Sequence, residues 1–328
     1  MMRDSVIEFV DKELWPNKER FEKKDYALTE EVMKKAGELG YLSIAVPEAY
    51  GGMGMGFTNT VLVCDYISGA TGSFSTAFGA HTGIGTMPIT LYGTEEQKQK
   101  YVPKLASGEW FGAYCLTEPG AGSDANSGKT KAVLSEDGKY YSITGGKMWI
   151  SNAGFAEIFI VFARIEDDKN ITAFILEFDK ENPNGVSLGE EENKLGIRGS
   201  DTHSLMFTDV KVPKENRIGE DGFGFKFAMK TLAGGRIGIA SQALGIASGA
   251  YELALKYSKE RKAFGKEISK HQAIAFKLAD MAVQIEAARH LCIKAAWDKD
   301  QKQNYDLSGA MAKLYAAEMA MQVTIEAV

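Results

Sequence analysis

The stretch Tyr-Cys-Leu-Thr-Glu-Pro-Gly-Ala-Gly-Ser-Asp at residues 114–124 stands where the composition of the chain changes. Helical patterns precede it, and short runs rich in Ile, Phe, Tyr and Val follow it. The stretch offers backbone N–H groups, the aliphatic hydroxyls of Thr117 and Ser123, and little side-chain bulk, which suit the edge of a planar cofactor or an anionic ligand. The competing interpretation is an ordinary turn between two domains.

The residues on either side of this stretch predict two different kinds of domain. Residues 1–112 predict a helical domain, in which Thr94 and Gln97 form a capping box that opens a helix ending near Ser107. Residues 113–217 predict a small β-barrel or sandwich, because β-rich runs alternate there with turn signals such as Gly145-Gly146. The β-rich runs are 139–144, 147–151, 157–165, 171–178 and 203–210.

Residues 218–328 predict an incomplete bundle of long up-and-down helices, so the expected fold class is α+β with three domains. Three apolar stripes at helical spacing support this prediction. The first contains Phe225, Met229, Leu232, Arg236, Ile239, Ala243 and Ile246; the second contains Ile274, Leu278, Met281, Ile285, Ala288, Cys292 and Ala295; the third contains Leu307, Met311, Leu314, Met321, Ile325 and Val328. The third stripe runs to the last residue without a cap, so we expect the chain to stop within a helix.

Composition excludes several classes of partner and location. The chain of 328 residues carries 38 Lys and Arg against 44 Asp and Glu, so its net charge of -6 argues against a nucleic-acid partner. Three cysteines without a zinc spacing favour a reducing compartment, and the first residues lack the apolar core of a signal peptide. No apolar run reaches the ~20 residues of a membrane span. We therefore expect a cytoplasmic protein.

The common motifs for metal ions, nucleophiles and phosphate loops are absent. The four histidines show no paired metal-ligand spacing, and the chain has no G-x-S-x-G elbow. The sequence Gly-Gly-Lys-Met at 145–148 lacks the Ser or Thr of a Walker loop. A metalloenzyme, a serine hydrolase and a P-loop protein are therefore disfavoured.

Three further positions allow both a structural and a functional interpretation. Trp149 lies in a β-rich run, where an aromatic side chain is usually part of the core. Arg236 interrupts an apolar stripe, where its guanidinium would need either an ion pair with Glu318 or a ligand. Arg261 precedes a predicted helix junction and could bind phosphate or lie in a solvated turn.

Together these segments resemble the acyl-CoA dehydrogenase family, in particular its short- and medium-chain members. The resemblance rests on motifs in the family's order and spacing across essentially the whole chain. They are YCLTEPGAGSD (114–124), KMWISN (147–152), KLGIR (194–198), GRIGIASQALG (235–245), RKAFG (261–265) and His271-Gln272. The family fold has a helical domain, a β domain and a four-helix domain, which agrees with the three regions described above.

The resemblance implies an FAD-dependent oxidoreductase that introduces a trans double bond between the α and β carbons of a fatty acyl-CoA. In the family a glutamate removes the α-proton, the β-hydrogen leaves as hydride to the flavin, and electrons pass to an electron-transfer flavoprotein. Two alternatives remain: an acyl-CoA oxidase that uses oxygen, and a non-catalytic flavin- or CoA-binding scaffold. Small residues at Thr76, Ala77 and Ala80 favour a deep pocket, whereas 235–238 favours a short-chain substrate.

The resemblance also assigns roles to individual residues. Those expected to bind FAD are Tyr114, Leu116, Thr117, Gly122, Ser123, Trp149, Ile150 and Ser151, with Arg261, Phe264 and Gln272 reaching the FAD of a neighbouring subunit. Those expected to bind substrate are Ser123, Gly235 and Arg236. The contacts to a neighbouring subunit imply a homo-oligomer, usually a tetramer in the family. No metal site is implied.

The sequence departs from the family pattern at the catalytic base. The family's usual glutamate belongs to a segment beyond Val328, and Gly235 occupies the position where some members carry the base instead. Ala233 replaces an acidic residue that contacts substrate in many relatives. We therefore assign no catalytic residue to this chain, expect it to be truncated at both ends, and expect it not to turn over efficiently as given.

Overall fold

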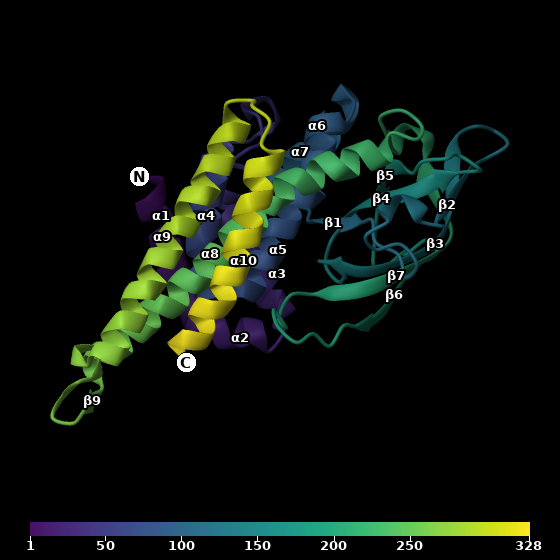
Figure 1. Cartoon of the computed structure of the whole chain (residues 1–328). Helices are drawn as coiled ribbons and strands as arrows, with labels where there is room; N and C mark the ends of the chain where they lie inside the picture. The colour runs from purple at the N-terminus through teal and green to yellow at the C-terminus, as the bar shows by residue number, and fades with distance from the viewer. The chain divides into compact units, whose positions relative to one another are not determined.

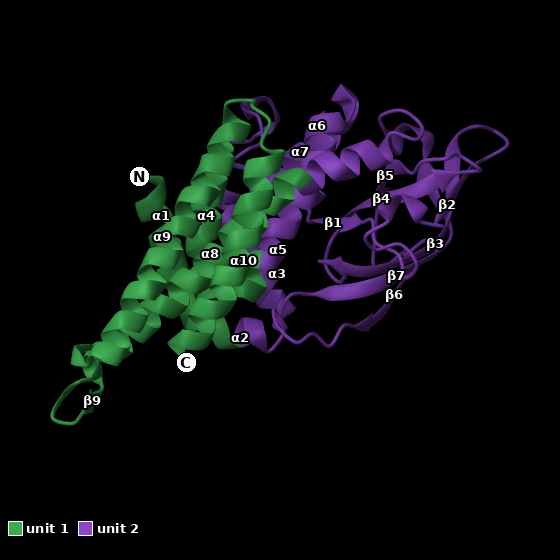
Figure 2. Ribbon diagram, in the orientation of Figure 1, with its two compact units in different colours: residues 1–19, 56–75, 233–328 green, residues 20–55, 76–232 purple.

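The chain folds into two units, each assembled from segments that are far apart in sequence (Figures 1 and 2). The computed structural model describes all of residues 1–328. Unit 1 comprises Met1–Glu19, Gly56–Ser75 and Ala233–Val328, and unit 2 comprises Arg20–Met55 and Thr76–Leu232. The predicted order of a helical, a β and a second helical region is confirmed. The predicted domain boundaries at residues 112 and 217 stay predictions.

Unit 1 is a bundle of helices. Its helices are α1 (Met2–Phe9), α4 (Phe57–Ala70), most of α8 (Gly224–Glu260), α9 (Gln272–Asp300) and α10 (Asp306–Ala327), with the strands β9 (Lys262–Ala263) and β10 (Lys266–Glu267) paired as a hairpin between α8 and α9. Asp300 ties α9 to α4, because its carboxylate accepts hydrogen bonds from the N–H and hydroxyl of Thr58 at 3.0 and 2.7 Å. This carboxylate caps the exposed N–H groups at the start of α4.

The three predicted apolar stripes have different outcomes. The second stripe is confirmed, because Met281, Ile285 and Cys292 are buried in the bundle core. The third is wrong: its members are exposed, and α10 instead buries Gly309, Ala312, Ala316, Met319, Ala320 and Val323. The first is displaced by about one residue, because α8 buries Ala233, Ile237, Ala240, Leu244 and Ala247. Helices α8 and α10 carry apolar or small side chains on nearly every side, so periodicity alone cannot select the buried face.

Unit 2 combines helices with the sheet of the chain. The helices are α3 (Tyr26–Glu38), α6 (Met87–Tyr92) and α7 (Glu95–Ser107), while α2 (Lys18–Glu22), α5 (Gly72–Gly79) and α8 contribute residues to both units. The predicted capping box is confirmed, because Thr94 and Gln97 exchange hydrogen bonds of 2.9 and 3.2 Å. In the same unit, α7 packs Tyr101, Val102 and Leu105 into the core that also contains the sheet residues Ile160 and Phe162.

The sheet is mixed, with the strand order β6-β7-β3-β2-β4-β5-β8 and with β1 paired in parallel to β4. The strands are β1 (Gly112–Cys115), β2 (Lys131–Leu134), β3 (Tyr140–Ser151), β4 (Ile158–Ile165), β5 (Thr172–Glu177), β6 (Val186–Glu191), β7 (Thr202–Pro213) and β8 (Arg217–Ile218). Each of the five predicted β-rich runs lies largely in one of these strands. The chain thus enters β1, leaves it as the 116–130 loop, and returns in β2.

The prediction of a turn at Gly145-Gly146 is wrong. Both glycines lie inside β3, which runs unbroken through the two runs that the sequence separated. Gly145 has a φ of +152°, and a Cβ there would lie 2.6 Å from the Cα of Thr130, so β3 can pass this backbone only with glycine. The pairing of β3 with β7 also shifts register between Ile143 and Gly145. Elsewhere, no helix of the chain combines the length and apolar character that crossing a membrane requires.

Candidate functional site

The loop of residues 116–130, which we call the connecting loop, joins β1 to β2 in unit 2. It begins with a tight turn in which Glu118 and Ala121 exchange two backbone hydrogen bonds of 3.1 and 3.0 Å. The residues at its tip are exposed: Pro119, Gly120, Gly122, Ser123 and Asp124. A Cβ added at Gly120 or Gly122 would meet no atom within 4 Å, so the backbone here is open to a ligand. The loop therefore presents polar backbone at a fixed turn.

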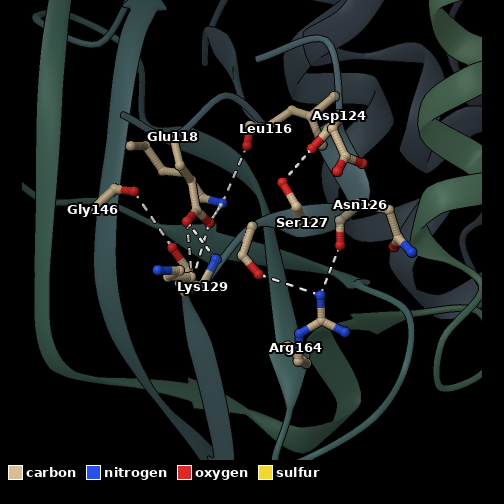
Figure 3. Close-up of polar contacts among 11 residues, drawn as sticks. Leu116, Glu118, Asp124, Asn126, Ser127, Lys129, Gly146 and Arg164 are labelled. Atoms are coloured by element: carbon tan, nitrogen blue, oxygen red, sulfur yellow. Dashed lines mark hydrogen bonds and ion pairs between the residues drawn. The ribbon is translucent and has the colours of Figure 1, made fainter. Parts of the chain in front are cut away.

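A buried ion pair lies at the base of the connecting loop (Figure 3). The Lys147 ammonium donates to Glu118 Oε1 at 2.6 Å and to the carbonyl oxygen of Leu116 at 3.3 Å. The same carboxylate accepts the backbone N–H groups of Lys129 at 2.6 Å and of Thr130 at 3.1 Å. The Glu118 side chain therefore joins the start of the connecting loop to its end and to strand β3.

Burial and charge act against each other at this pair. Burial alone would raise the pKa of Glu118, but the Lys147 ammonium and the backbone donors hold that pKa below its usual value. Burial lowers the pKa of Lys147, and the Glu118 carboxylate opposes that shift. Each charge therefore stabilises the other within the buried pair. Gly128 leaves room for the carboxylate, since a Cβ there would lie 2.9 Å from Glu118 Oε1.

Arg164 on β4 bonds the second half of the connecting loop (Figure 3). Its Nη2 donates to the carbonyl oxygens of Asn126 at 2.7 Å and Gly128 at 3.4 Å. Its Nη1 donates to the carbonyl oxygens of Asp168 and Lys169, both at 2.5 Å. This guanidinium has only carbonyl partners, so its fork of donors serves to fix backbone. The connecting loop is therefore attached to the sheet at two separate points.

Trp149 has an unusual backbone and an unusual exposure. Its φ is +60°, in the left-handed region that bulky residues rarely adopt, and it falls where β3 shifts register against β7. The indole is 60% exposed, so the interpretation of Trp149 as a core residue is wrong. An exposed aromatic held in a strained conformation is typical of a binding surface.

The structure brings together most of the predicted site residues of unit 2. Met148 donates its N–H to the carbonyl oxygen of Thr117 at 2.9 Å, so the segment containing Trp149 adjoins the connecting loop. The hydroxyls of Thr117, Ser123 and Ser151 make no hydrogen bond within the chain. The Thr117 and Ser151 hydroxyls near an exposed indole can serve a ligand that has both a flat ring and polar edges.

The other predicted residues of unit 2 are buried. Tyr114 and Leu116 are part of the core, and Ile150 is 2% exposed, so its side chain belongs to the sheet interior. Tyr114 stacks edge-on against Phe162 with ring centroids 4.9 Å apart, and its buried hydroxyl has no partner. A backbone group of Ile150 could contact a ligand, but its side chain could not without rearrangement.

The predicted residues of unit 1 fall into two groups on the long helices. Gly235 and Arg236 lie within α8, whereas Arg261 and Phe264 lie at the β9–β10 hairpin and Gln272 begins α9. From Arg236 to Arg261 the chain advances 261 − 236 = 25 residues, and at ~1.5 Å per helical residue this is ~37 Å. The two groups therefore cannot line one small-molecule site within a single chain.

Arg236 differs from the expectation in one respect. Its side chain is exposed, and it forms no ion pair with Glu318. The guanidinium points away from the buried face of α8 because that face is displaced by one residue, as described above. Gly235 beside it has no atom within 4 Å of a Cβ position, so the helix surface is open there. At the hairpin, Phe264 is 96% exposed with a φ of +52°.

Several residues of the site had no role in the sequence analysis. Glu118 and Lys147 lie within the quoted motifs, and the available signal was one charged residue in each: Glu118 in the loop motif and Lys147 in a β-rich run. Arg164 lies outside all motifs, and only the fold brings it to the connecting loop. Thr130, the last residue of that loop, also lies outside the motifs. The expectation of no metal site remains an expectation; the structure contains no cluster of three or more His, Cys, Asp or Glu side chains suited to a metal ion.

Comparison with protein families shows matches along the whole chain. Residues 1–109 match the description "Acyl-CoA dehydrogenase, N-terminal domain", residues 113–210 match the middle domain, and residues 222–328 match the C-terminal domain.

Individual relatives give the same result. The short-chain specific acyl-CoA dehydrogenase of Clostridium acetobutylicum is 45% identical over 331 residues, which cover 100% of this chain and 86% of that protein. The mitochondrial short-chain specific acyl-CoA dehydrogenase of Bos taurus is 41% identical and is covered to 79%. The solved structure of butyryl-CoA dehydrogenase from Megasphaera elsdenii is 42% identical and superimposes with a TM-score of 0.92, covering 99% of this chain and 86% of that one.

Proposed function

Because this chain belongs to the acyl-CoA dehydrogenase family, we propose that it binds FAD and a fatty acyl-CoA and that its enzymatic activity is α,β-dehydrogenation of the acyl group. The observation that carries the FAD proposal is the exposed, left-handed Trp149 beside the connecting loop. An isoalloxazine is flat, with a polar pyrimidine edge. It would stack on the indole while the unused Thr117 hydroxyl bonds that edge. Solved relatives of this family include FAD complexes from Bacillus anthracis and of PigA.

The residues present fit such a cofactor in two regions. Thr117, Trp149 and Ser151 would line the ring, with the buried Tyr114, Leu116 and Ile150 contributing backbone only. The open backbone at Gly122 and the free hydroxyl of Ser123 would meet the pyrophosphate, where N–H groups and small residues allow close approach. When bound, FAD supplies the acceptor for the hydride that leaves the β carbon. The protein's part is to hold that acceptor at a fixed height and orientation.

The substrate proposal concerns α8. Gly235 leaves the helix surface open, and the exposed Arg236 can hold an anionic or carbonyl group of the acyl-CoA. Ser123 would contact the thioester from the connecting loop. We propose a straight-chain acyl group of short to medium length, in line with the relatives named above. The Ala233 methyl cannot provide the acidic contact that many relatives make.

The residues at the far end of the long helices support a homo-oligomer. Arg261, Phe264 and Gln272 are exposed and too distant from Arg236 to share its ligand, so we propose that they contact the FAD of another subunit. A tetramer is the proposed assembly. We further propose an electron-transfer flavoprotein as acceptor. A solved structure that is 44% identical, with a TM-score of 0.93, is described as the electron transferring flavoprotein of Acidaminococcus fermentans. Three free buried cysteines favour the cytoplasm.

A titration tests this function without depending on turnover. The FAD-loaded chain is mixed with butyryl-, octanoyl- and palmitoyl-CoA, and the visible flavin absorption is followed. We expect saturable spectral changes with the butyryl and octanoyl thioesters, and none with free CoA as the matched control. Flavin binding without any response to the three thioesters would contradict the substrate proposal. Peroxide release under air would indicate an oxidase instead.

A further inference from the structure

The Glu118–Lys147 pair is deeply buried, although buried ion pairs contribute little to the free energy of folding. The two side chains are 7% and 1% exposed. Removing two charges from water costs several kcal/mol for each ion, and apolar replacements of such pairs are often neutral or stabilising. A buried pair therefore contributes little net stability, while it does impose one specific arrangement on the groups it bonds.

The bonded groups are the backbone of the segments that would face the flavin. Lys147 bonds the carbonyl of Leu116, which directly precedes Thr117. The N–H of the next residue in β3, Met148, bonds the Thr117 carbonyl, and Trp149 follows. The Glu118 carboxylate adds the N–H groups of Lys129 and Thr130. The pair thus bonds the connecting loop at both ends, and its lysine belongs to the strand that carries the indole.

We propose that Glu118 and Lys147 are positioning residues that hold Thr117 and Trp149 at a fixed separation before FAD binds. This inference rests on the proposed FAD site and extends it to two residues that touch no ligand. The physical reason is preorganisation: a site ordered in advance loses less conformational entropy on binding. Charge-assisted bonds are stronger than neutral ones, and two of those made here are short: Lys147 to Glu118 and the Lys129 N–H to Glu118 both measure 2.6 Å.

The test compares FAD affinity with stability in matched variants. Glu118→Gln and Lys147→Met each remove one charge, and their double variant removes both. Ile143→Val in β3 is the control, because it removes a buried methyl group from the same strand and no charge. We expect each single variant to weaken FAD binding roughly tenfold beyond the control at equal loss of Tm, about the value of one charge-assisted hydrogen bond. In the double variant, Tm should recover while FAD affinity should not.

The opposite pattern would overturn the proposal. If FAD affinity follows Tm along one line for all four variants, the pair is structural and does not position the site. Hydrogen exchange of the cofactor-free chains gives a second readout: the amides of Ala121, Thr130 and Met148 should exchange faster in Glu118→Gln than in the control. If the unaltered chain takes up no FAD, the proposed function fails, and this exchange experiment alone decides the positioning role; equal exchange would refute it.

Discussion

The backbone N–H of Met148 donates a hydrogen bond of 2.9 Å to the carbonyl oxygen of Thr117. This bond joins β3 to the connecting loop at the point where each segment offers an unsatisfied side chain to a ligand. Since Lys147 anchors the preceding carbonyl of Leu116, the two segments are held together by consecutive contacts. A ligand that touches both the indole and the Thr117 hydroxyl would therefore meet one rigid edge, and a disturbance of either segment should reach the other.

The left-handed backbone of Trp149 predicts that the indole needed for FAD binding lowers the stability of the fold at this position. Trp149→Gly and Trp149→Ala both remove the indole, but only glycine relieves the positive φ. We expect Trp149→Gly to be about 0.5–1 kcal/mol more stable to urea than Trp149→Ala, and both to lose FAD affinity equally. Equal stabilities would mean that the bulge imposes no strain, and unchanged FAD affinity would remove Trp149 from the site.

The displaced stripe of α8 predicts contrasting effects at two isoleucines. Ile237 is fully buried in the core of unit 1, whereas Ile239 on the same helix is 49% exposed. Ile237→Ala should lower the free energy of unfolding by about 2–5 kcal/mol, because it leaves a cavity. Ile239→Ala should change it by about 0.5 kcal/mol or less. Urea denaturation of the two variants distinguishes the observed face of the helix from the face that the sequence suggested.

His81 predicts a pH dependence of stability. Burial lowers the pKa of this imidazole to about 4. Its Nδ1 accepts the N–H of Gly112 at 3.0 Å and its Nε2 donates to the Leu105 carbonyl at 2.9 Å, an arrangement that needs the neutral ring. Between pH 6.5 and 4 the unfolded chain therefore binds a proton that the folded chain does not. This histidine's contribution to stability is complete above pH 6.5 and is lost as the pH falls toward 4.

The measurement is the difference in unfolding free energy between the unaltered chain and His81→Gln at several pH values. Glutamine keeps a donor and an acceptor but cannot titrate. We expect the advantage of histidine over glutamine to shrink by up to about 1.4 kcal/mol per pH unit below 6.5. A difference that stays constant from pH 7 to 4.5 would show that His81 is not held neutral.

The separation of Arg261 from Arg236 predicts different losses in their alanine variants. Arg261→Ala should weaken FAD retention in the assembled enzyme, because this side chain is proposed to reach the cofactor of another subunit. Arg236→Ala should leave flavin content unchanged and weaken acyl-CoA binding instead. Flavin absorbance per chain after gel filtration measures the first effect, and thioester titration measures the second. Equal flavin content in both variants would contradict the assignment of Arg261.

The order of helical, β and helical regions could be predicted because composition and turn signals act locally. Which face of each helix is buried could not be predicted as well, because it depends on packing against other segments. The stripe containing Leu307 and Met311 was misassigned because α10 is apolar on nearly every side, and only packing selected its alanine face. The turn at Gly145 was misassigned because glycine is required there by close contact with Thr130, which is distant in sequence.

In the candidate site too, features set by neighbouring residues in the sequence could be predicted, whereas features set by distant segments could not. The connecting loop could be located from its small and polar residues. The exposure of Trp149 could not, because a strand sequence does not reveal a register shift against β7. Arg164 was missed entirely, since its contacts with the connecting loop are to the carbonyls of Asn126 and Gly128, which only the fold brings to it.

The most direct test of the account is equilibrium binding of FAD to the purified 328-residue chain, followed by quenching of flavin fluorescence. We expect saturable uptake of one FAD per chain. In Trp149→Ala this uptake should be abolished or strongly weakened, while circular dichroism shows that the fold is retained. A well-folded chain that leaves added FAD free in solution would contradict it.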